Sequence, residues 1–516
     1  MPKERYTAGK NRGDLQLGKR NRHHSPGVEW DVIVIGTGLG GSSAGAICAL
    51  HGLKTLILEK NQRIGGSCSY YEKNGFHIDT GTHLFIRGNK GPFGVCTQRL
   101  GMGTPIEFLH TKKTTLFRGI NVDLYIPEGR LRRAFITAPI LVWQLRISPI
   151  HYPALIHLLW DIVIMKQQEI DALDNVTIEE FMFRYTKDPK VRAMFGILMG
   201  LFFILPPWQA SAGESIWNIQ KIIKEDNLGY PRGGAVAIPQ TILDGAKSHG
   251  AEIRVGAEVK KIEYSKGRVA GVVLKNGERI TSRAVISTTS IGDTVFNLTG
   301  SEFFPRPYVE RIREIKGSWS AVQAKIALKK PLIKSGSIVG GIPLKFDGAI
   351  NDNLAHDFIS NLEEGIASDM VPIYAPIPTN YDPDLAPEGC QIITAGAAAP
   401  TLDIKLRDDS SAWIDGLMRA LYSLIPGLKE NIIFCDTWSV KKISSWIGKM
   451  SGSAVTTGQS VKQVRGSRPE HHTPVKGLYI AGDCGGYARG VGTELACQSG
   501  MDCGDMVARD LYGDSK

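Results

Sequence analysis

Several patterns that would place this chain in a familiar class of protein are absent from its 516 residues. The eight cysteines are scattered, and they form neither a Cys-x-x-Cys pair nor a Cys/His cluster with the spacing of zinc ligands. A His-Glu-x-x-His motif is also missing, so we expect no metal site. The cysteines are predicted to be reduced and mostly buried, which is consistent with a cytoplasmic protein.

Apolar runs long enough to cross a bilayer are missing as well. The most apolar stretch, residues 134–165, is interrupted by three prolines and an arginine. A second apolar run, residues 193–205, ends at Pro206. Because a spanning helix needs roughly 20 consecutive apolar residues, neither stretch is predicted to be transmembrane.

Two interpretations of these apolar stretches stay open. They form either core helices that line or cap a substrate cavity, or a patch that lies in the membrane surface and admits a lipid directly. In the second interpretation, tryptophans lie near the lipid headgroups and basic residues lie outside them. These residues are Trp143, Trp160, Trp208, Arg146 and Lys166. The second interpretation implies peripheral contact with a membrane.

The excess of positive charge is concentrated at the start of the chain. The formal net charge is +10, and residues 1–28 contribute +5 of it, with seven Lys or Arg against Glu4 and Asp14. This segment has little apolar content and lacks the apolar core of a secretory signal, so it is predicted to be a disordered basic tail. We interpret it as a solvated extension. The alternative is that the tail contacts an anionic partner, either a lipid surface or nucleic acid. No nucleic-acid partner is expected.

The most informative feature that is present is a glycine motif. An apolar strand runs into Gly36, Gly38, Gly40 and Gly41, and the next apolar run ends at Glu59, 18 residues after Gly41. In such a motif the first glycine allows a tight turn, a second lets the backbone approach a pyrophosphate, and the last lets the helix pack on the sheet. The helix N-terminus attracts the phosphates, and the acid is placed to bind an adenosine ribose. The spacing predicts a dinucleotide site.

Three further segments indicate that the dinucleotide is FAD rather than NAD. Residues 60–67 bring a second glycine pair back toward the phosphates; the predicted cofactor residues there are Lys60, Arg63, Gly65, Gly66 and Ser67. Far downstream, a strand ends in Gly482 and Asp483, where an acid can bind hydroxyls of an extended flavin cofactor. Gly492 then precedes a helix-like run whose positive end would face the flavin pyrimidine ring, where negative charge gathers on reduction. A simple NAD dehydrogenase needs no such return near its C-terminus.

Four strings of the sequence resemble the group of phytoene desaturases, carotenoid isomerases and retinol saturases, which belongs to the flavin amine-oxidase-like superfamily. The strings are residues 59–66, 75–83, 382–389 and 481–483, and the resemblance covers roughly residues 29–512. It implies that Val259 contacts adenine through its backbone. The stretch 485–494 departs from the glycine-rich segment expected of carotene desaturases, and the Asp-Thr-Gly-Thr-His string favours the isomerase and saturase branch.

The predicted fold class is α/β, with a Rossmann-type FAD-binding domain interleaved with an α+β substrate-binding domain that carries an apolar helical insert. The FAD-binding domain is predicted from residues 29–110, 230–295 and 470–512. The substrate domain is predicted from residues 111–229 and 296–469. Strand candidates in the middle segment, and the turn Asn276-Gly277 between two of them, support this division.

Three residues are catalytic candidates because the resemblance and the motifs place them near the flavin. His83 would be an acid–base group with a pKa suited to neutral pH, and a structural, hydrogen-bonded histidine is the alternative. Arg489 would add positive charge beside the reduced flavin, against a surface or phosphate-binding arginine. Glu494 would exchange a proton with a substrate carbon, against a carboxylate that caps the first turn of its helix.

The function expected from the resemblance is that of an FAD-dependent oxidoreductase acting on a hydrophobic polyene or isoprenoid. Desaturation, saturation and cis–trans isomerisation all stay open, and so does the electron acceptor. A flavin amine oxidase is the alternative; it would need an aromatic cage, to which Tyr487 and Trp446 could contribute. A non-catalytic prenyl-binding protein of the same architecture is the third interpretation, and the intact cofactor motifs weigh against it.

Overall fold

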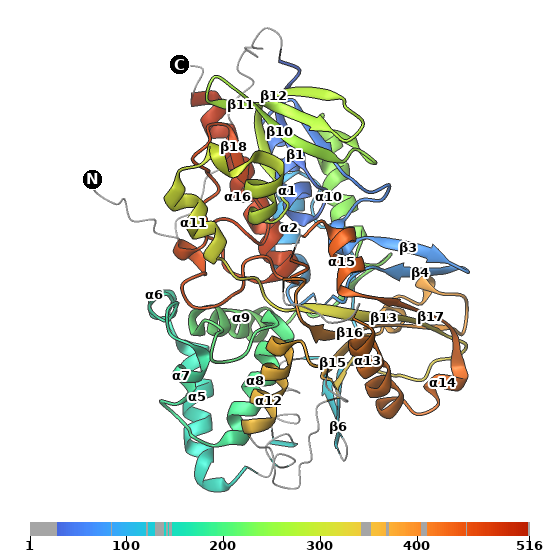
Figure 1. Cartoon of the computed structure of the whole chain (residues 1–516). Coiled ribbons are helices and arrows are strands. Elements are labelled where there is room, and N and C mark those ends of the chain that lie inside the picture. The colour runs from blue at the N-terminus through green and yellow to red at the C-terminus, as the bar shows by residue number, and fades with distance from the viewer. Residues whose placement is uncertain are drawn as a thin grey trace.

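The computed structural model describes most of the chain apart from its N-terminal segment. It covers residues 28–83, 85–119, 122–129, 139–140, 143, 147–341, 352–367, 371–403, 410–449 and 451–513. The predicted basic tail, except for its last residue, and Arg146 lie outside the described residues. Figure 1 shows a sheet with helices in the upper half of the molecule and, below it, a helical group beside a second sheet.

The upper sheet has seven strands, in which β1 (Trp30–Ile35) is central. It pairs in parallel with β2 (Thr55–Leu58) on one side and with β12 (Arg279–Ser287) on the other. Strands β1 (WDVIVI) and β2 (TLIL) are nearly continuous apolar runs, as expected of parallel strands covered on both faces. The remaining strands are β9 (Glu252–Arg254), β10 (Val259–Ser265), β11 (Arg268–Leu274) and β18 (Leu478–Ile480).

Two helices from opposite ends of the chain pack tightly beside this sheet. They are α1 (Leu39–Leu50) and α16 (Gly492–Gly513). A Cβ atom on Gly500 of α16 would lie 2.2 Å from the carbonyl oxygen of Gly40, so only glycine permits this approach. The close packing brings the C-terminal segment to the glycine motif. Helices α2 (Pro92–Arg99), α10 (Ala237–Ser248) and α11 (Arg306–Glu314) also belong to this half.

The lower sheet also has seven strands, in the order β17-β13-β16-β15-β14-β6-β7. Alternate residues of β13 face opposite sides: Val322, Ala324 and Ile326 join an apolar core with α13 (Ser411–Leu424). The other side contacts the hairpin of β3 (Tyr70–Lys73) and β4 (Phe76–Asp79). The strands are β6 (Lys113–Gly119), β7 (Val122–Pro127), β13 (Ser320–Leu328), β14 (Ser337–Gly340), β15 (Ile373–Pro376), β16 (Gln391–Ala399) and β17 (Ile432–Trp438).

The helical group at the lower left of Figure 1 has its own apolar core. It consists of α5 (Tyr152–Ile164), α6 (Gln167–Ala172), α7 (Ile178–Met182), α8 (Pro189–Phe203) and α9 (Ala212–Glu225). One side of α5 is buried in this core through Leu155, Leu158 and Ile162. Within the described ranges, no helix is both long and apolar enough to cross a membrane.

Smaller elements complete the chain. They are β5 (Phe108–Leu109), β8 (Tyr230–Pro231), α12 (Asp352–Glu364), α14 (Leu428–Asn431) and α15 (Val440–Ile447).

The main elements expected from the sequence are confirmed. The predicted strands of the middle segment match β9 to β12, and the turn at Gly277, where φ is +90°, joins β11 to β12. The cysteines are free, and six of the eight are buried. The upper sheet takes its strands from segments near residues 30–58, 252–287 and 478–480; the exact limits of the two domains stay a prediction.

Candidate cofactor and active site

In the turn between β1 and α1, one glycine faces open space, whereas the neighbouring glycines pack against other protein atoms. Gly36 has φ +102°, and a Cβ atom on Gly41 would lie 2.0 Å from the Gly36 carbonyl oxygen. A Cβ atom on Gly40 would lie 2.8 Å from Cα of Gly482, which joins the two distant motifs. At Gly38, by contrast, an added Cβ would meet no protein atom within 4 Å. The turn is therefore closed toward the protein and open at the position expected to approach a pyrophosphate.

Glu59 is held beside this turn by Thr37, a residue that the motif analysis did not single out. The backbone N–H and the hydroxyl of Thr37 both donate to Oε2 of Glu59, at 3.0 and 2.6 Å. The Thr37 hydroxyl in turn accepts from the Gly65 N–H at 3.1 Å. Glu59 is 4% exposed, and its other oxygen accepts from the Asn61 N–H at 2.9 Å. One hydroxyl thus ties together the glycine turn, the acid and the second glycine pair.

The second glycine pair packs against the first motif, but the basic residues beside it, Lys60 and Arg63, contact other parts of the protein. An added Cβ on Gly66 would lie 3.1 Å from Cα of Gly38. The Lys60 ammonium donates to the carbonyl oxygen of Ser445 in α15, and the Arg63 guanidinium lies 4.6 Å from the ring centre of Tyr70. Lys60 and Arg63 therefore have protein partners at the edge of the site. Val259 is buried in β10, and Ser67 contributes its carbonyl oxygen to a contact with His83.

The C-terminal motif is held by residues of the lower half of the molecule. Both carboxylate oxygens of Asp483 have partners: Lys449 Nζ donates at 2.9 Å, and Thr456 donates from its N–H at 3.0 Å and from its hydroxyl at 2.8 Å. Burial favours a higher pKa for Asp483, but Lys449 and the Thr456 bonds hold it below its usual range. The carboxylate is therefore ionised and fixed by hydrogen bonds within the protein, and its contact with cofactor hydroxyls stays a prediction.

Arg489 does not present a free positive charge. Its guanidinium is 5% exposed and contacts three carboxylates, of Glu214 at 3.1 Å, Asp171 at 2.8 Å and Asp174 at 2.6 Å. Arg489 is therefore neither an unpaired charge available to a reduced flavin nor an arginine at the surface. The sequence could not reveal it, because the partners lie about 300 residues away.

Glu494 lies in the first turn of α16 but does not cap its own helix. Its Oε1 accepts from the backbone N–H of Arg87 at 3.2 Å, and its Oε2 lies 3.8 Å from Nη1 of Arg87. The Arg87 guanidinium pairs more closely with Glu225, at 2.6 Å. Burial raises the pKa of Glu494 to about 7, although Arg87 opposes the shift. This carboxyl can hold or release a proton near neutral pH, as an acid–base group requires.

His83 is buried beside the second glycine pair. Its Nε2 lies 2.8 Å from the carbonyl oxygen of Ser67, and its own carbonyl oxygen accepts from the Tyr374 hydroxyl at 3.1 Å. Burial lowers the pKa of His83 to about 4, so its imidazole is neutral at pH 7. The expected pKa near neutrality is wrong, and the geometry favours the alternative of a hydrogen-bonded, structural histidine.

Buried polar groups lie on the side of the lower sheet that contacts the β3–β4 hairpin, and in the segment after β4. Lys325 of β13 is fully buried; its ammonium contacts Oε1 of Gln323 and lies 4.1 Å from the ring centre of Trp438. Burial lowers its pKa well below the usual range. The buried hydroxyls of Thr82 and Thr394 have no hydrogen-bond partner. No sequence motif marks Lys325 or Thr394, because each is an ordinary strand residue, whereas Thr82 lies within the string 75–83.

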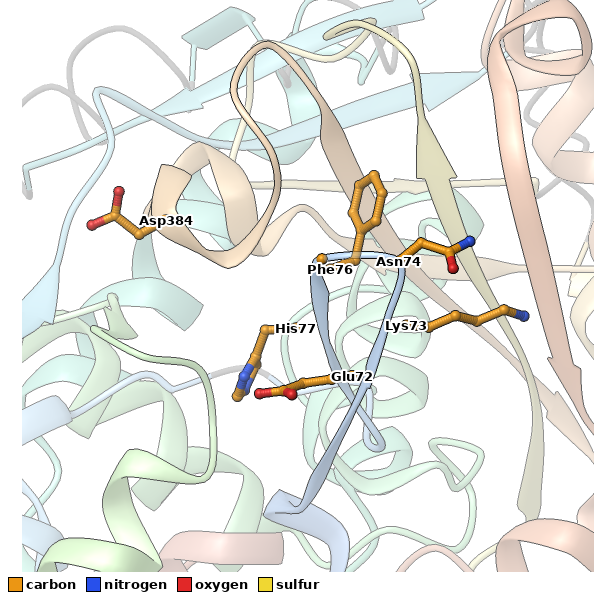
Figure 2. Close-up of a pocket in the computed structure, with 7 residues that line it drawn as sticks. Glu72, Lys73, Asn74, Phe76, His77 and Asp384 are labelled. Atoms are coloured by element: carbon orange, nitrogen blue, oxygen red, sulfur yellow. The ribbon is translucent and has the colours of Figure 1, made fainter.

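A separate pocket lies at the tip of the β3–β4 hairpin, outside the set of predicted site residues. Its volume is about 540 Å³, and Figure 2 shows the side chains of Glu72 and His77 on the same side of the hairpin, with Lys73 directed away from them. Residues Glu72 and His77 are direct cross-strand partners, which explains their common side. The pocket is a surface feature of the hairpin.

The aromatic pair considered for an amine oxidase is not assembled. Tyr487 is 50% exposed and its hydroxyl donates to Glu470 at 2.8 Å. Trp446 instead donates from its indole N–H to Gly66 at 3.3 Å and packs against Trp438. In the part of the chain that the structure describes, no ring contact joins Tyr487 to Trp446.

The residues brought together fit a flavin dinucleotide. The glycine turn is open at Gly38, the buried acid Glu59 stands beside it, and Gly66 and Gly482 close around the turn. Gly492, the first residue of α16, has φ +55° and open space where a side chain would be. Backbone N–H groups and a helix N-terminus suit phosphates and an electron-rich ring.

Comparisons with known proteins agree with this geometry. Residues 47–503 match the family of flavin containing amine oxidoreductases. A chloroplastic prolycopene isomerase of Daucus carota is 26% identical, over 94% of this chain and 80% of that protein. A 4,4'-diapolycopene oxygenase of a Methylomonas species is 22% identical, over 93% of this chain and 98% of its own length. The structure of a redesigned putrescine oxidase shares the fold, with a TM-score of 0.64, 14% identity, and coverage of 93% of this chain and 99% of the other.

Proposed function

The chain belongs to the family of flavin containing amine oxidoreductases and is an FAD-dependent oxidoreductase, and from this premise we propose that its substrate is a hydrophobic polyene or isoprenoid. The observation that carries the proposal is the match of 94% of the chain to a prolycopene isomerase. The match to a diapolycopene oxygenase along nearly the whole of both chains supports the same substrate class. The reaction is desaturation, saturation or cis–trans isomerisation of C=C bonds.

Bound FAD supplies the acceptor or donor of a hydride, and the chain supplies orientation, dryness and electrostatics. We assign the phosphates to the N–H groups around Gly36, Gly38, Gly40 and Gly41, and the adenosine ribose to Glu59. Gly65 and Gly66 close the phosphate side, and Val259 lies at the adenine side. The backbone at Gly482 and the start of α16 at Gly492 hold the flavin side.

The two acid–base candidates, Glu494 and His83, differ in protonation state. Glu494 can carry a proton at neutral pH, whereas His83 is neutral and fixed by Ser67. We therefore assign the acid–base role to Glu494 and an orienting role to His83. The apolar core of α5 to α9 supplies the walls that exclude water from an apolar substrate.

An anaerobic visible spectrum of the purified protein tests the proposal. We expect flavin bands that respond to polyenes: bleaching on mixing indicates desaturation. Conversion of polyene only after chemical reduction of the flavin indicates saturation or isomerisation. A flavin spectrum that no polyene changes in either redox state, but that a panel of amines bleaches, would overturn the proposal in favour of an amine oxidase. A protein that binds no FAD would favour a binding role instead.

We also propose that the enzyme is cytoplasmic and docks on an anionic membrane surface through α5. Ile156, Trp160 and Ile164 lie one turn apart on its outer side and are 67%, 62% and 53% exposed. Trp143 and Ile150, next to the same helix in sequence, are 76% and 79% exposed. Figure 1 shows α5 on the outer side of the helical group. Burying a stripe of this kind in a lipid interface recovers about 25 cal/mol for each Å² of apolar area.

The charges beside α5 suit anionic headgroups. Lys166 follows the helix, and Arg184 and Lys187 lie in the segment after α7; all three are exposed. That segment is joined to α5 by the bond from the Tyr185 hydroxyl to Asp161, at 2.7 Å. Trp208, also considered for the membrane patch, is half-buried. Basic residues beside an apolar stripe are typical of interfacial helices.

Sedimentation with vesicles of phosphatidylglycerol and phosphatidylcholine tests the docking surface. The double variant Ile156→Ser, Trp160→Ser is expected to bind at least about tenfold more weakly, because both side chains leave the interface. The matched control is Ile433→Ser, an apolar residue of β17 that is 42% exposed and away from α5. Wild-type protein that stays in the supernatant, or equal binding by both variants, would contradict the docking surface.

A further inference from the structure

Glu214 is a fully buried carboxylate whose partners lie in a distant part of the chain. It is 0% exposed, Oε1 lies 3.1 Å from Nη1 of Arg489, and Oε2 accepts from the backbone N–H of Gly490 at 3.2 Å. Removing a carboxylate from water is costly unless charge and hydrogen bonds compensate for it. Both of its oxygens therefore serve the segment that precedes α16.

The position of Glu214 on its own helix makes this use unusual. It is the third residue of α9, whose N-cap is Ser211, and a glutamate there ordinarily accepts from the N-cap N–H. Helix α7 shows that arrangement: the Thr177 N–H donates to Glu180 at 2.9 Å. In α9 the Ser211 N–H donates instead to the carbonyl oxygen of Gln459, at 2.9 Å. The Glu214 carboxylate is thus released from capping and reaches across to Gly490.

The segment that Glu214 reaches, residues 485–492, is here called the C-terminal glycine loop. A second buried ion fixes it from the other side, because Arg468 donates to the carbonyl oxygens of Gly486 at 3.2 Å and Ala488 at 2.8 Å. Gly490 has φ +126°, a conformation that disfavours any side chain. Val491 packs against the apolar core of the helical group. The loop is therefore held at several points before α16 begins at Gly492.

We infer that Glu214 is a positioning residue for the flavin: it fixes the N–H of Gly490 and thereby sets where the N-terminal amides of α16 point. This inference rests on the proposed placement of the flavin at the start of α16. A helix N-terminus stabilises negative charge only over its first turn, so a small displacement of the loop weakens the interaction. Helix α9 of the substrate half would in this way control the affinity and the reduction potential of the flavin.

The variant Glu214→Gln in the FAD-loaded protein tests the inference. The amide keeps the shape but cannot serve both the Arg489 guanidinium and the Gly490 N–H as an acceptor. We expect FAD to dissociate with a Kd about tenfold higher, the size of one lost charge-assisted bond, and the flavin midpoint potential to fall. The matched control is Asp171→Asn, which removes a carboxylate from the same Arg489 but makes no bond to the loop backbone. Its Kd and potential are expected to stay within about twofold of wild type.

Two results would overturn the inference. One is a Glu214→Gln protein with the wild-type Kd and the wild-type midpoint potential. The other is an equal change in Asp171→Asn, which would assign the effect to the charge of Arg489 rather than to Gly490. If Glu214→Gln does not fold, Glu214→Asp, which keeps the charge but withdraws the carboxylate, must show the same shifts. A wild-type protein without FAD would instead overturn the proposed function.

Discussion

Two glycine-rich segments meet at the candidate site, and they are held in place by different means. The first, residues 36–41, is stabilised by Thr37, Glu59 and Gly65, partners within 28 residues of one another. The second, the C-terminal glycine loop, has one partner near in sequence, Arg468, which is 18 and 20 residues from the carbonyls that it contacts. Its other charged partners are the carboxylates of Asp171, Asp174 and Glu214, which lie at least 275 residues away.

The first segment is held by contacts that are local in sequence, whereas most charged partners of the second come from distant parts of the chain. The first segment needs only its own strand, turn and helix to adopt its conformation, so it is complete once β1, α1 and β2 pack. The second depends on the docking of α6 and α9 against the upper half. If this docking failed, the cofactor site would be intact around the phosphates and disturbed around the flavin ring.

The largest effect is expected when the central cation of the long-range network is removed. Arg489→Met removes the cation paired with the buried Glu214 and leaves Asp171 and Asp174 with Arg465, which should reduce the free energy of unfolding by about 3–5 kcal/mol. Chemical denaturation measures it. Arg306→Met is the control, because Arg306 pairs with Glu310 on the surface and is 90% exposed. Equal denaturation midpoints for the two variants would show that the network does not stabilise the fold.

The next effect concerns Glu494, whose partner Arg87 also pairs with Glu225 of α9. Its pKa is about 7 in the folded protein against 4.5 when unperturbed, so the folded state binds the proton more tightly. Its contribution to stability is then complete below pH 4.5 and is lost as the pH rises through about 7.

The variant Glu494→Gln should not show this loss of stability with rising pH. Relative to the variant, the wild-type protein is expected to lose about 3 kcal/mol of unfolding free energy between about pH 4.5 and 7. Denaturation curves across this range measure it. Exposed Glu302, changed to Gln, is the control and should leave the wild-type pH profile unaltered. A parallel profile for wild type and Glu494→Gln would contradict the raised pKa.

A smaller effect, confined to the local segment, is expected at Gly41. The Cβ of Gly41→Ala would lie 2.0 Å from the Gly36 carbonyl oxygen, so the turn must shift, at a cost of about 1–3 kcal/mol. FAD affinity should fall by roughly tenfold to a hundredfold, as titration of the apoprotein would show. Gly196→Ala in α8, whose added Cβ would meet its nearest neighbour at 3.7 Å, should bind FAD normally. Unchanged FAD binding by Gly41→Ala would contradict the assigned phosphate turn.

The smallest effect is expected at the rim of the long-range network. Asp171 is 31% exposed and shares Arg489 with two other carboxylates, so solvent screens much of its charge. Asp171→Asn should change the free energy of unfolding by less than about 1 kcal/mol. A loss as large as that of Arg489→Met would show that the network acts as one inseparable unit.

Much of the fold was predictable because its evidence is periodic and local. The apolar runs that became β1, β2 and β12, and the turn at Gly277, are legible in short windows of sequence. The roles of single side chains were less predictable from the sequence. Arg489 was expected to be available to the flavin, and His83 to titrate near neutrality; burial and distant partners changed both. Glu494 was identified as an acid–base candidate, but its contact with Arg87 was not foreseen.

The dinucleotide motif follows from local sequence, because the spacing of Gly36, Gly41 and Glu59 encodes a strand, a turn and a helix that pack as neighbours. Which charges are free, in contrast, depends on the packing of the whole molecule. Whether Arg489 presents a charge depends on partners that folding brings from about 300 residues away. For Asp483 and Lys325 the partners are nearer in sequence, and the state of each charge also depends on the water that burial removes. Local geometry follows from local sequence, whereas electrostatics depends on everything that surrounds a group in space.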